Sequence, residues 1–185
     1  EIVGLIARDT VFSGDFDAYL DANFPATGGQ TQQVDTLFLS QINEWRVALS
    51  NELYAQGGRY ASLEVLNDVV QEFINQIVFL RICEDKNLPL YHKLKDTITD
   101  ADQLQPKLEE LFRSADRLYN SGMFYGEDII FDLSCEVIKG MIEDLYYPQS
   151  PYLFNIIEPN LLGKIYEIFL TEQLVLLENN TIGLG

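Results

Sequence analysis

Few residues in this sequence have the types and spacing that catalysis requires. The only histidine is His92, and no cysteine or second histidine stands near it at the spacing of zinc ligands. A Ser–His–Asp or Cys–His arrangement would need this same residue, and no nucleophile-elbow motif marks a serine or cysteine. We therefore interpret His92 as a surface or helix-capping residue.

One acidic motif matches part of a nuclease signature. Glu84-Asp85-Lys86 has the Glu-x-Lys spacing with which metal-dependent nucleases place a carboxylate and a lysine on a strand. Here the motif ends a strongly helical pattern, which disfavours a nuclease site. The adjacent acids Glu127-Asp128 and Glu143-Asp144 point in different directions on a helix, so we interpret them as solvated surface.

Two glycine patterns also fall short of a binding motif. Gly122-x-x-x-Gly126 lacks the Lys-Ser or Lys-Thr of a phosphate loop, and Gly183-x-Gly185 is too short for a cofactor loop. The sequence therefore predicts no catalytic, cofactor-binding or metal-binding residue.

The charge of the chain argues against direct DNA binding. The sequence has 29 acidic and 12 basic residues, a net charge of −17. DNA-binding proteins displace counterions with clustered Lys and Arg, whereas the densest basic group here is Lys86, Lys93 and Lys95. Any contact with DNA is expected through other parts of a longer protein.

The cysteines and the hydropathy indicate a compartment. Cys83 and Cys135 lie in apolar helical stretches, so buried thiols in a reducing cytoplasm are favoured over a disulfide. No apolar run approaches the roughly 20 residues that cross a bilayer, and no signal peptide is visible. We expect a soluble, cytoplasmic chain, cut from a longer one.

Two long helices dominate the predicted fold. Apolar residues three or four apart predict a helix over 31–56, ended by Gly57-Gly58, and a second from the N-cap Ser62 to about Lys86. Between Phe73 and Cys83 the second helix is apolar almost all round, so it should lie at the centre of the bundle.

Shorter elements complete a mainly all-α fold, an irregular helical bundle around one central long helix. Helices are expected over 15–24, 91–98, 106–119 (inner face Leu108, Leu111, Phe112, Ala115 and Leu118), 134–146 and 160–173, with short extended segments at 152–157 and 174–178. The predicted organisation is an irregular N-terminal segment (1–30), a helical domain (31–173) and the start of a linker (174–185).

Three charged residues end the central helix. A charge entering an apolar helix is costly unless it is paired. For Arg81, Glu84 and Asp85 we favour an internal salt bridge that fixes a neighbouring segment, and a contact with another domain is the alternative.

Three stretches resemble the helical connector domain of adenine-specific DNA methyltransferases of restriction–modification systems, in the order in which that family has them. They are Glu44-Trp45-Arg46 with Leu49, the run from Leu66 to Lys86 with Phe79-Leu80-Arg81-Ile82-Cys83-Glu84-Asp85, and Leu162-Gly163-Lys164-Ile165-Tyr166-Glu167-Ile168-Phe169-Leu170. The resemblance marks Trp45, Arg46, Arg81, Glu84, Asp85, Tyr166 and Glu167 as structural or interdomain residues.

The resemblance also implies what should lie elsewhere. The family's glycine loop for S-adenosylmethionine and its Asn-Pro-Pro-Tyr or Asn-Pro-Pro-Phe motif, which holds a flipped adenine, are absent from this sequence. The resemblance therefore implies that the parent protein holds the cofactor and the catalytic domain, within about a hundred residues after Gly185, with or without a nuclease at the N-terminal side.

Two functional hypotheses remain. The first is a non-catalytic helical connector whose partners are the other domains of its own parent chain. The second is a free-standing acidic helical protein that mimics DNA or binds another protein, which the charge of −17 favours.

Overall fold

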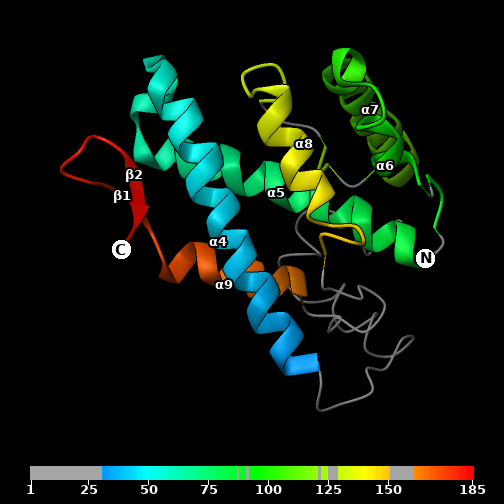
Figure 1. Ribbon diagram of the computed structural model, residues 1–185, viewed down its shortest axis with the longest axis horizontal. Coiled ribbons are helices and arrows are strands. Elements are labelled where there is room, and N and C mark those ends of the chain that lie inside the picture. Colours follow the sequence, from blue (N-terminus) through cyan, green and yellow to red (C-terminus); the bar gives the residue numbers. More distant parts are fainter. Residues whose placement is uncertain (1–30, 87, 91, 121, 125–128, 151–160) are drawn as a thin grey trace.

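The structure is a computed structural model that describes residues 31–86, 88–90, 92–120, 122–124, 129–150 and 161–185 (Figure 1). In chain order its elements are α4 (Thr31–Gln56), the 3₁₀ turn Gly58–Ala61, α5 (Leu63–Asp85), α6 (Lys93–Thr97), the 3₁₀ turn Ala101–Gln103, α7 (Leu104–Tyr119), α8 (Cys135–Glu143), α9 (Leu161–Thr171), β1 (Leu174–Leu176) and β2 (Ile182–Leu184). The prediction of a mainly all-α fold is confirmed.

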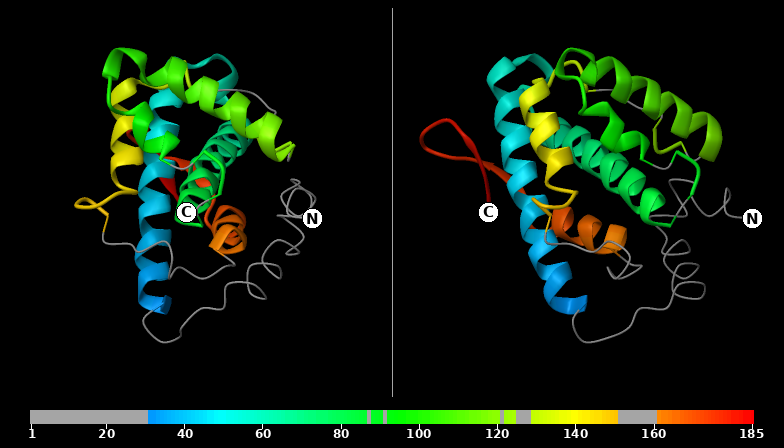
Figure 2. Two further views of the ribbon diagram at one scale, coloured as in Figure 1. Left: turned by 90° about the vertical axis from the view of Figure 1, so that its right-hand side faces the viewer. Right: turned by 45° about the vertical axis from the view of Figure 1, so that its right-hand side comes forward.

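Helix α5 lies at the centre of the arrangement, as its sequence predicted. Its N-cap Ser62 accepts a hydrogen bond from the Val65 N–H, and every residue from Phe73 to Leu80 is buried. Helix α4 crosses α5 on one side and α9 packs on both of them, while α6 and α7 lie together toward the other end of α5 (Figure 2). Among the described helices, none is long and apolar enough to cross a membrane.

Helix α4 ends where the sequence predicted. Gly57 and Gly58 follow its last residue with φ of 70° and 60°, a left-handed backbone region that glycine enters without steric cost. One stripe of α4 is buried in the core, and it consists of Phe38, Ile42, Trp45, Leu49 and Leu53. The helix therefore presents a single apolar face to α5 and its neighbours.

Two predicted helix details are wrong. Leu118, expected on the inner face of α7, is 41% exposed, and Tyr119 is buried in its place. The Tyr119 hydroxyl donates to the Pro89 carbonyl, which fixes the ring on the inner side. Helix α8 ends at Glu143 rather than at Tyr146 because the chain tightens into i→i+3 turns, which bury both Leu145 and Tyr146.

The extended segment predicted after α9 pairs with a second strand, which the sequence did not predict. Strands β1 and β2 form an antiparallel hairpin in which Leu174 faces Leu184 and Leu176 faces Ile182. The chain reverses through a turn where Asn180 adopts a φ of 60°. The hairpin packs against α4 (Figure 1), while the assignment of residues 174–185 to a linker stays a prediction. The helix expected over 15–24 and the strand expected over 152–157 lie outside the described residues.

Candidate functional site

The guanidinium of Arg46 joins the three stretches that carry the family resemblance. Arg46 is completely buried in α4. Its Nη1 donates to Asn43 Oδ1 at 3.2 Å, and its Nη2 donates to Asn67 Oδ1 of α5 at 3.1 Å and to the Glu172 carbonyl, just after α9, at 2.7 Å. We call Arg46 and these three partners the arginine junction.

Burial and stacking define the electrostatics of the junction. The guanidinium carbon lies 4.0 Å from the centroid of the Phe169 ring in α9, a cation–π geometry. Burial lowers the pKa of Arg46 to about 10, and the nearby Glu172 carboxylate opposes that shift, so the side chain stays protonated at neutral pH. The Glu172 carboxylate also accepts a hydrogen bond from the Asn43 amide. The junction thus holds a buried cation in place with a fixed set of acceptors.

Trp45, the neighbour of Arg46, binds a different element. Its ring is buried and meets Phe38 edge to face, with 5.8 Å between the ring centroids. Its Nε1–H donates to the Asp144 carboxylate, directly after α8, at 3.0 Å. The interpretation of Glu143-Asp144 as solvated surface is therefore wrong for Asp144, because its carboxylate accepts the hydrogen bond of the buried Trp45 indole. Glu143 does pair with Lys139 at the surface.

The charged end of α5 forms a second polar cluster. Arg81 forms an ion pair with Asp85 one turn later and donates its Nε–H to the Leu145 carbonyl at 3.1 Å. Its guanidinium carbon lies 4.7 Å from the centroid of the Tyr146 ring. The internal pairing predicted for Arg81 is therefore present, with Asp85 as the partner. These contacts hold the turn after α8 against α5.

Glu84 occupies the interior of this cluster. It is only 3% exposed, and its two oxygens accept hydrogen bonds from the Leu94 N–H of α6 at 3.0 Å and the Tyr146 hydroxyl at 2.6 Å. Burial raises the pKa of Glu84, an effect that these two hydrogen bonds and the charge of Arg81 counteract. The Glu-x-Lys motif therefore lies at the C-terminal end of α5, with Lys86 as the C-cap, and its glutamate joins α5 to α6 and to the turn after α8.

The other candidate residues have plain structural positions. Cys83 and Cys135 are free thiols, and burial raises the pKa of Cys83 to about 12. His92 is exposed at the N-cap position of α6, in a left-handed conformation with a φ of 58°. In the part of the chain that the structure describes, no group of three His, Cys, Asp or Glu side chains could hold a metal ion.

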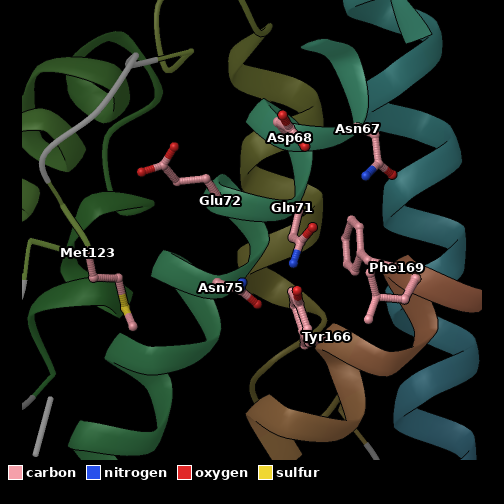
Figure 3. Close-up of a pocket in the computed structure, with 9 residues that line it drawn as sticks. Asn67, Asp68, Gln71, Glu72, Asn75, Met123, Tyr166 and Phe169 are labelled. Carbon is pink, nitrogen blue, oxygen red and sulfur yellow. The ribbon is translucent and has the colours of Figure 1, made fainter. Parts of the chain in front are cut away.

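A groove of about 380 Å³ runs between α5 and α9, beside the arginine junction (Figure 3). One side is a polar face of α5, and the other is formed by α9, with Met123 at one end. Tyr166 lines the groove, whereas Glu167 is exposed outside it. The lining residues are Asn67, Asp68, Gln71, Glu72, Asn75, Met123, Tyr166, Phe169 and Leu170.

The amides of α5 are the functional candidates that the sequence analysis missed. Asn67 binds Arg46, and Gln76 donates to the Met123 carbonyl at 2.9 Å. Asn75 is 5% exposed, yet its Oδ1 has no hydrogen-bond partner. The available signal was that Asn75 and Gln76 interrupt the most apolar run of the chain, since an amide there must be satisfied internally or serve a ligand.

One comparison with known proteins identifies a relative. Over 175 residues the chain is 42% identical to the type II restriction enzyme and methyltransferase RM.Eco57I of Escherichia coli. The match covers 94% of this chain and 17% of that protein, so the chain spans only a small part of its relative's length. No family model matches the sequence, and no solved structure matches the chain. The chain is thus related to a restriction–modification protein.

Proposed function

We propose that this chain is a non-catalytic helical connector within a restriction–modification protein whose other domains methylate adenine in DNA at N6, with or without a nuclease in the same polypeptide. The observation that carries the proposal is the arginine junction. One buried cation ties together the three stretches that resemble the family's connector domain. A side chain whose contacts all lie inside the fold stabilises a rigid spacer and takes no part in a reaction.

The share of the relative that this chain matches supports the same conclusion. Nearly all of this chain matches a segment of a protein named for two activities, and that segment is 17% of its length. Four polar side chains of the matched stretches contact other parts of this chain. Arg46, Trp45, Arg81 and Glu84 each join helix to helix or helix to turn. A connector needs such a set of internal contacts to transmit a fixed geometry between domains.

S-adenosylmethionine is the methyl donor implied for the parent. The Gly183-x-Gly185 segment of this chain has no room for it. A Cβ atom at Gly183 would lie 3.0 Å from Leu177 Cδ1, and one at Gly185 would lie 2.9 Å from Val175 Cγ1. These glycines therefore make room for hairpin side chains rather than for a cofactor. We therefore propose that the cofactor binds in a different domain of the parent.

Replacement of the matching segment in RM.Eco57I by this chain tests the connector function. We expect the replaced protein to keep its methyltransferase activity within about tenfold, because the junction residues supply the same spacer geometry. Replacement by an unrelated helical domain of equal length and net charge is the control, and it should abolish activity. Loss of activity with this chain, although it folds, would contradict the connector function.

The net charge of −17 favours a second candidate, a DNA mimic that occupies a basic groove of another protein. A mimic binds its target as a separate chain. Calorimetry of the isolated chain with basic DNA-binding proteins distinguishes the two functions. Tight binding that duplex DNA competes away would support the mimic, whereas the connector function predicts no such binding.

A further inference from the structure

The groove between α5 and α9 contains a buried acceptor that the described fold leaves unused. Asn75 Oδ1 has no hydrogen-bond partner although the residue is 5% exposed. Figure 3 shows this side chain directed toward Tyr166, into the groove. Native proteins satisfy nearly all buried polar atoms, so an unsatisfied one that lines a groove indicates a donor from outside.

The edge of the groove on α5 is acidic. Asp68 is exposed and Glu72 half-buried, and residues four apart on a helix project to the same side. Within the described residues, Asp68 forms no ion pair with a Lys or Arg side chain. Two carboxylates beside an unused acceptor favour a cationic donor and repel phosphate.

The opposite side of the groove suits an aliphatic chain. Leu170 of α9 is 58% exposed at its edge, and Tyr166 is half-buried beside it. Lysine and arginine bury their methylene stems along apolar surface while their charged ends stay near polar groups. A lysine or arginine whose methylene stem lies on α9 and whose charged end lies between Asp68 and Glu72 would bring an N–H donor toward Asn75 Oδ1.

We propose that the groove binds a Lys- or Arg-bearing polypeptide segment from another domain of the same restriction–modification protein. The choice of occupant rests on the proposed connector function and on charge complementarity with a chain of net charge −17. The groove then acts as the contact through which the connector holds a neighbouring domain, beside the arginine junction that fixes α5 against α9.

A peptide array tests the proposal. Overlapping short peptides cover the parts of RM.Eco57I that this chain does not match, together with peptides from unrelated basic DNA-binding proteins. They are probed with the chain and with the double variant Asp68→Asn/Glu72→Gln. The matched control is Glu109→Gln/Glu110→Gln on α7, which removes the same charge away from the groove and therefore weakens non-specific attraction equally.

The expected result is binding of Lys- or Arg-bearing peptides of the relative. The dissociation constant of the best peptide, measured by fluorescence anisotropy, should rise at least about tenfold for the groove variant and less than about twofold for the control. Asn75→Leu should also weaken binding several-fold without destabilising the chain, because it removes an unsatisfied amide. Replacement of the peptide's basic residue by methionine should abolish binding.

Three results would each overturn the proposal: no bound peptide, bound peptides without Lys or Arg, or equal weakening by the groove and control variants. Equal binding to the unrelated basic peptides would also overturn it, in favour of a DNA mimic. The segment replacement described above measures the connector function separately. An active replaced protein together with a failed array would therefore remove the groove proposal alone.

Discussion

The side-chain amide of Asn51 in α4 forms two hydrogen bonds with the backbone of Ile182 in β2. Asn51 Nδ2 donates to the Ile182 carbonyl at 2.9 Å, and Asn51 Oδ1 accepts from the Ile182 N–H at 2.8 Å. These backbone groups point away from β1, because the ladder bond beside them joins Leu177 to Thr181. One amide thus occupies the outer edge of β2, as a third strand would.

Asn51→Leu should detach the hairpin from α4. Loss of both hydrogen bonds leaves the Ile182 backbone unsatisfied, and we expect a decrease of about 1–3 kcal/mol in the free energy of unfolding. Hydrogen exchange of the Ile182 amide should accelerate in parallel. Asn179→Ala is the control, because among the described residues the Asn179 side chain bonds to Thr181 of the turn and not to Ile182. Unchanged protection of Ile182 in Asn51→Leu would contradict the prediction.

Arg46→Leu should destabilise the whole bundle. It leaves the Asn67 and Glu172 acceptors without their donor, and we expect a loss of about 3 kcal/mol in urea unfolding. Arg46→Lys should cost about 2 kcal/mol, because an ammonium cannot reproduce the planar fork or its stacking on Phe169. Arg113→Leu, which breaks an exposed pair with Glu109, should change stability by less than about 0.5 kcal/mol. Equal losses for Arg46→Leu and Arg113→Leu would refute the junction's role.

Arg81→Leu should loosen the turn after α8. The substitution removes the ion pair with Asp85 and the hydrogen bond to the Leu145 carbonyl, and we expect a loss of about 2 kcal/mol. Asp85→Asn keeps a hydrogen-bond acceptor and should cost about half as much. Thermal unfolding measures both. An unchanged melting temperature for Arg81→Leu would mean that the contacts of Arg81 within this chain contribute nothing to stability.

Glu84→Gln should change how stability depends on pH. The pKa of Glu84 is raised in the folded state from its ordinary value of 4.5, so folding favours the protonated carboxyl. The wild-type chain therefore gains stability as the pH falls through this raised pKa toward 4.5, and loses that contribution as the pH rises. The glutamine variant lacks this term. Its free energy of unfolding at pH 7 should be at least that of wild type. The difference in favour of the variant should decrease on acidification.

The matched substitution for this measurement is Glu84→Leu. Leucine cannot accept from the Leu94 N–H or the Tyr146 hydroxyl, so the variant should lose about 2 kcal/mol at neutral pH. Because leucine does not titrate, this loss relative to wild type should grow as the pH falls through the raised pKa of Glu84. Urea unfolding of the three proteins between acidic and neutral pH gives the comparison. A lead of the glutamine variant that stays constant with pH would show that Glu84 does not titrate differently on folding.

The isolated chain should bind neither duplex DNA nor S-adenosylmethionine. Its net charge of −17 opposes phosphate, and its terminal glycines serve the hairpin. Gel shifts near physiological salt and calorimetry with the cofactor measure these two interactions. A DNA affinity that falls steeply with added salt would reveal a basic surface, and micromolar cofactor binding would contradict the placement of the methyl donor in another domain.

Local patterns were enough to predict the main helices. The apolar spacing of α4 and α5, the glycines after Gln56 and the N-cap at Ser62 act over one or two helical turns, so the sequence contains them directly. The mainly α-helical fold followed from these elements. The buried face at the end of α7 and the end of α8 did not, because Tyr119 and Tyr146 are held by Pro89 and Glu84 respectively, which are distant in sequence.

The sequence by itself determined which side chains would be costly to bury, among them Arg46, Arg81, Glu84 and the amides of α5. Only the tertiary structure decided how each is satisfied. The two Nη atoms of Arg46 donate to Asn43, Asn67 and the Glu172 carbonyl, although its Nε has no partner among the described residues. Arg81 donates to Leu145, Glu84 accepts from Leu94 and Tyr146, and Asn75 Oδ1 has no partner in the described chain. The physical reason is that burial depends on a residue's own helix and its periodicity, whereas a hydrogen-bond partner depends on which remote segments pack against it.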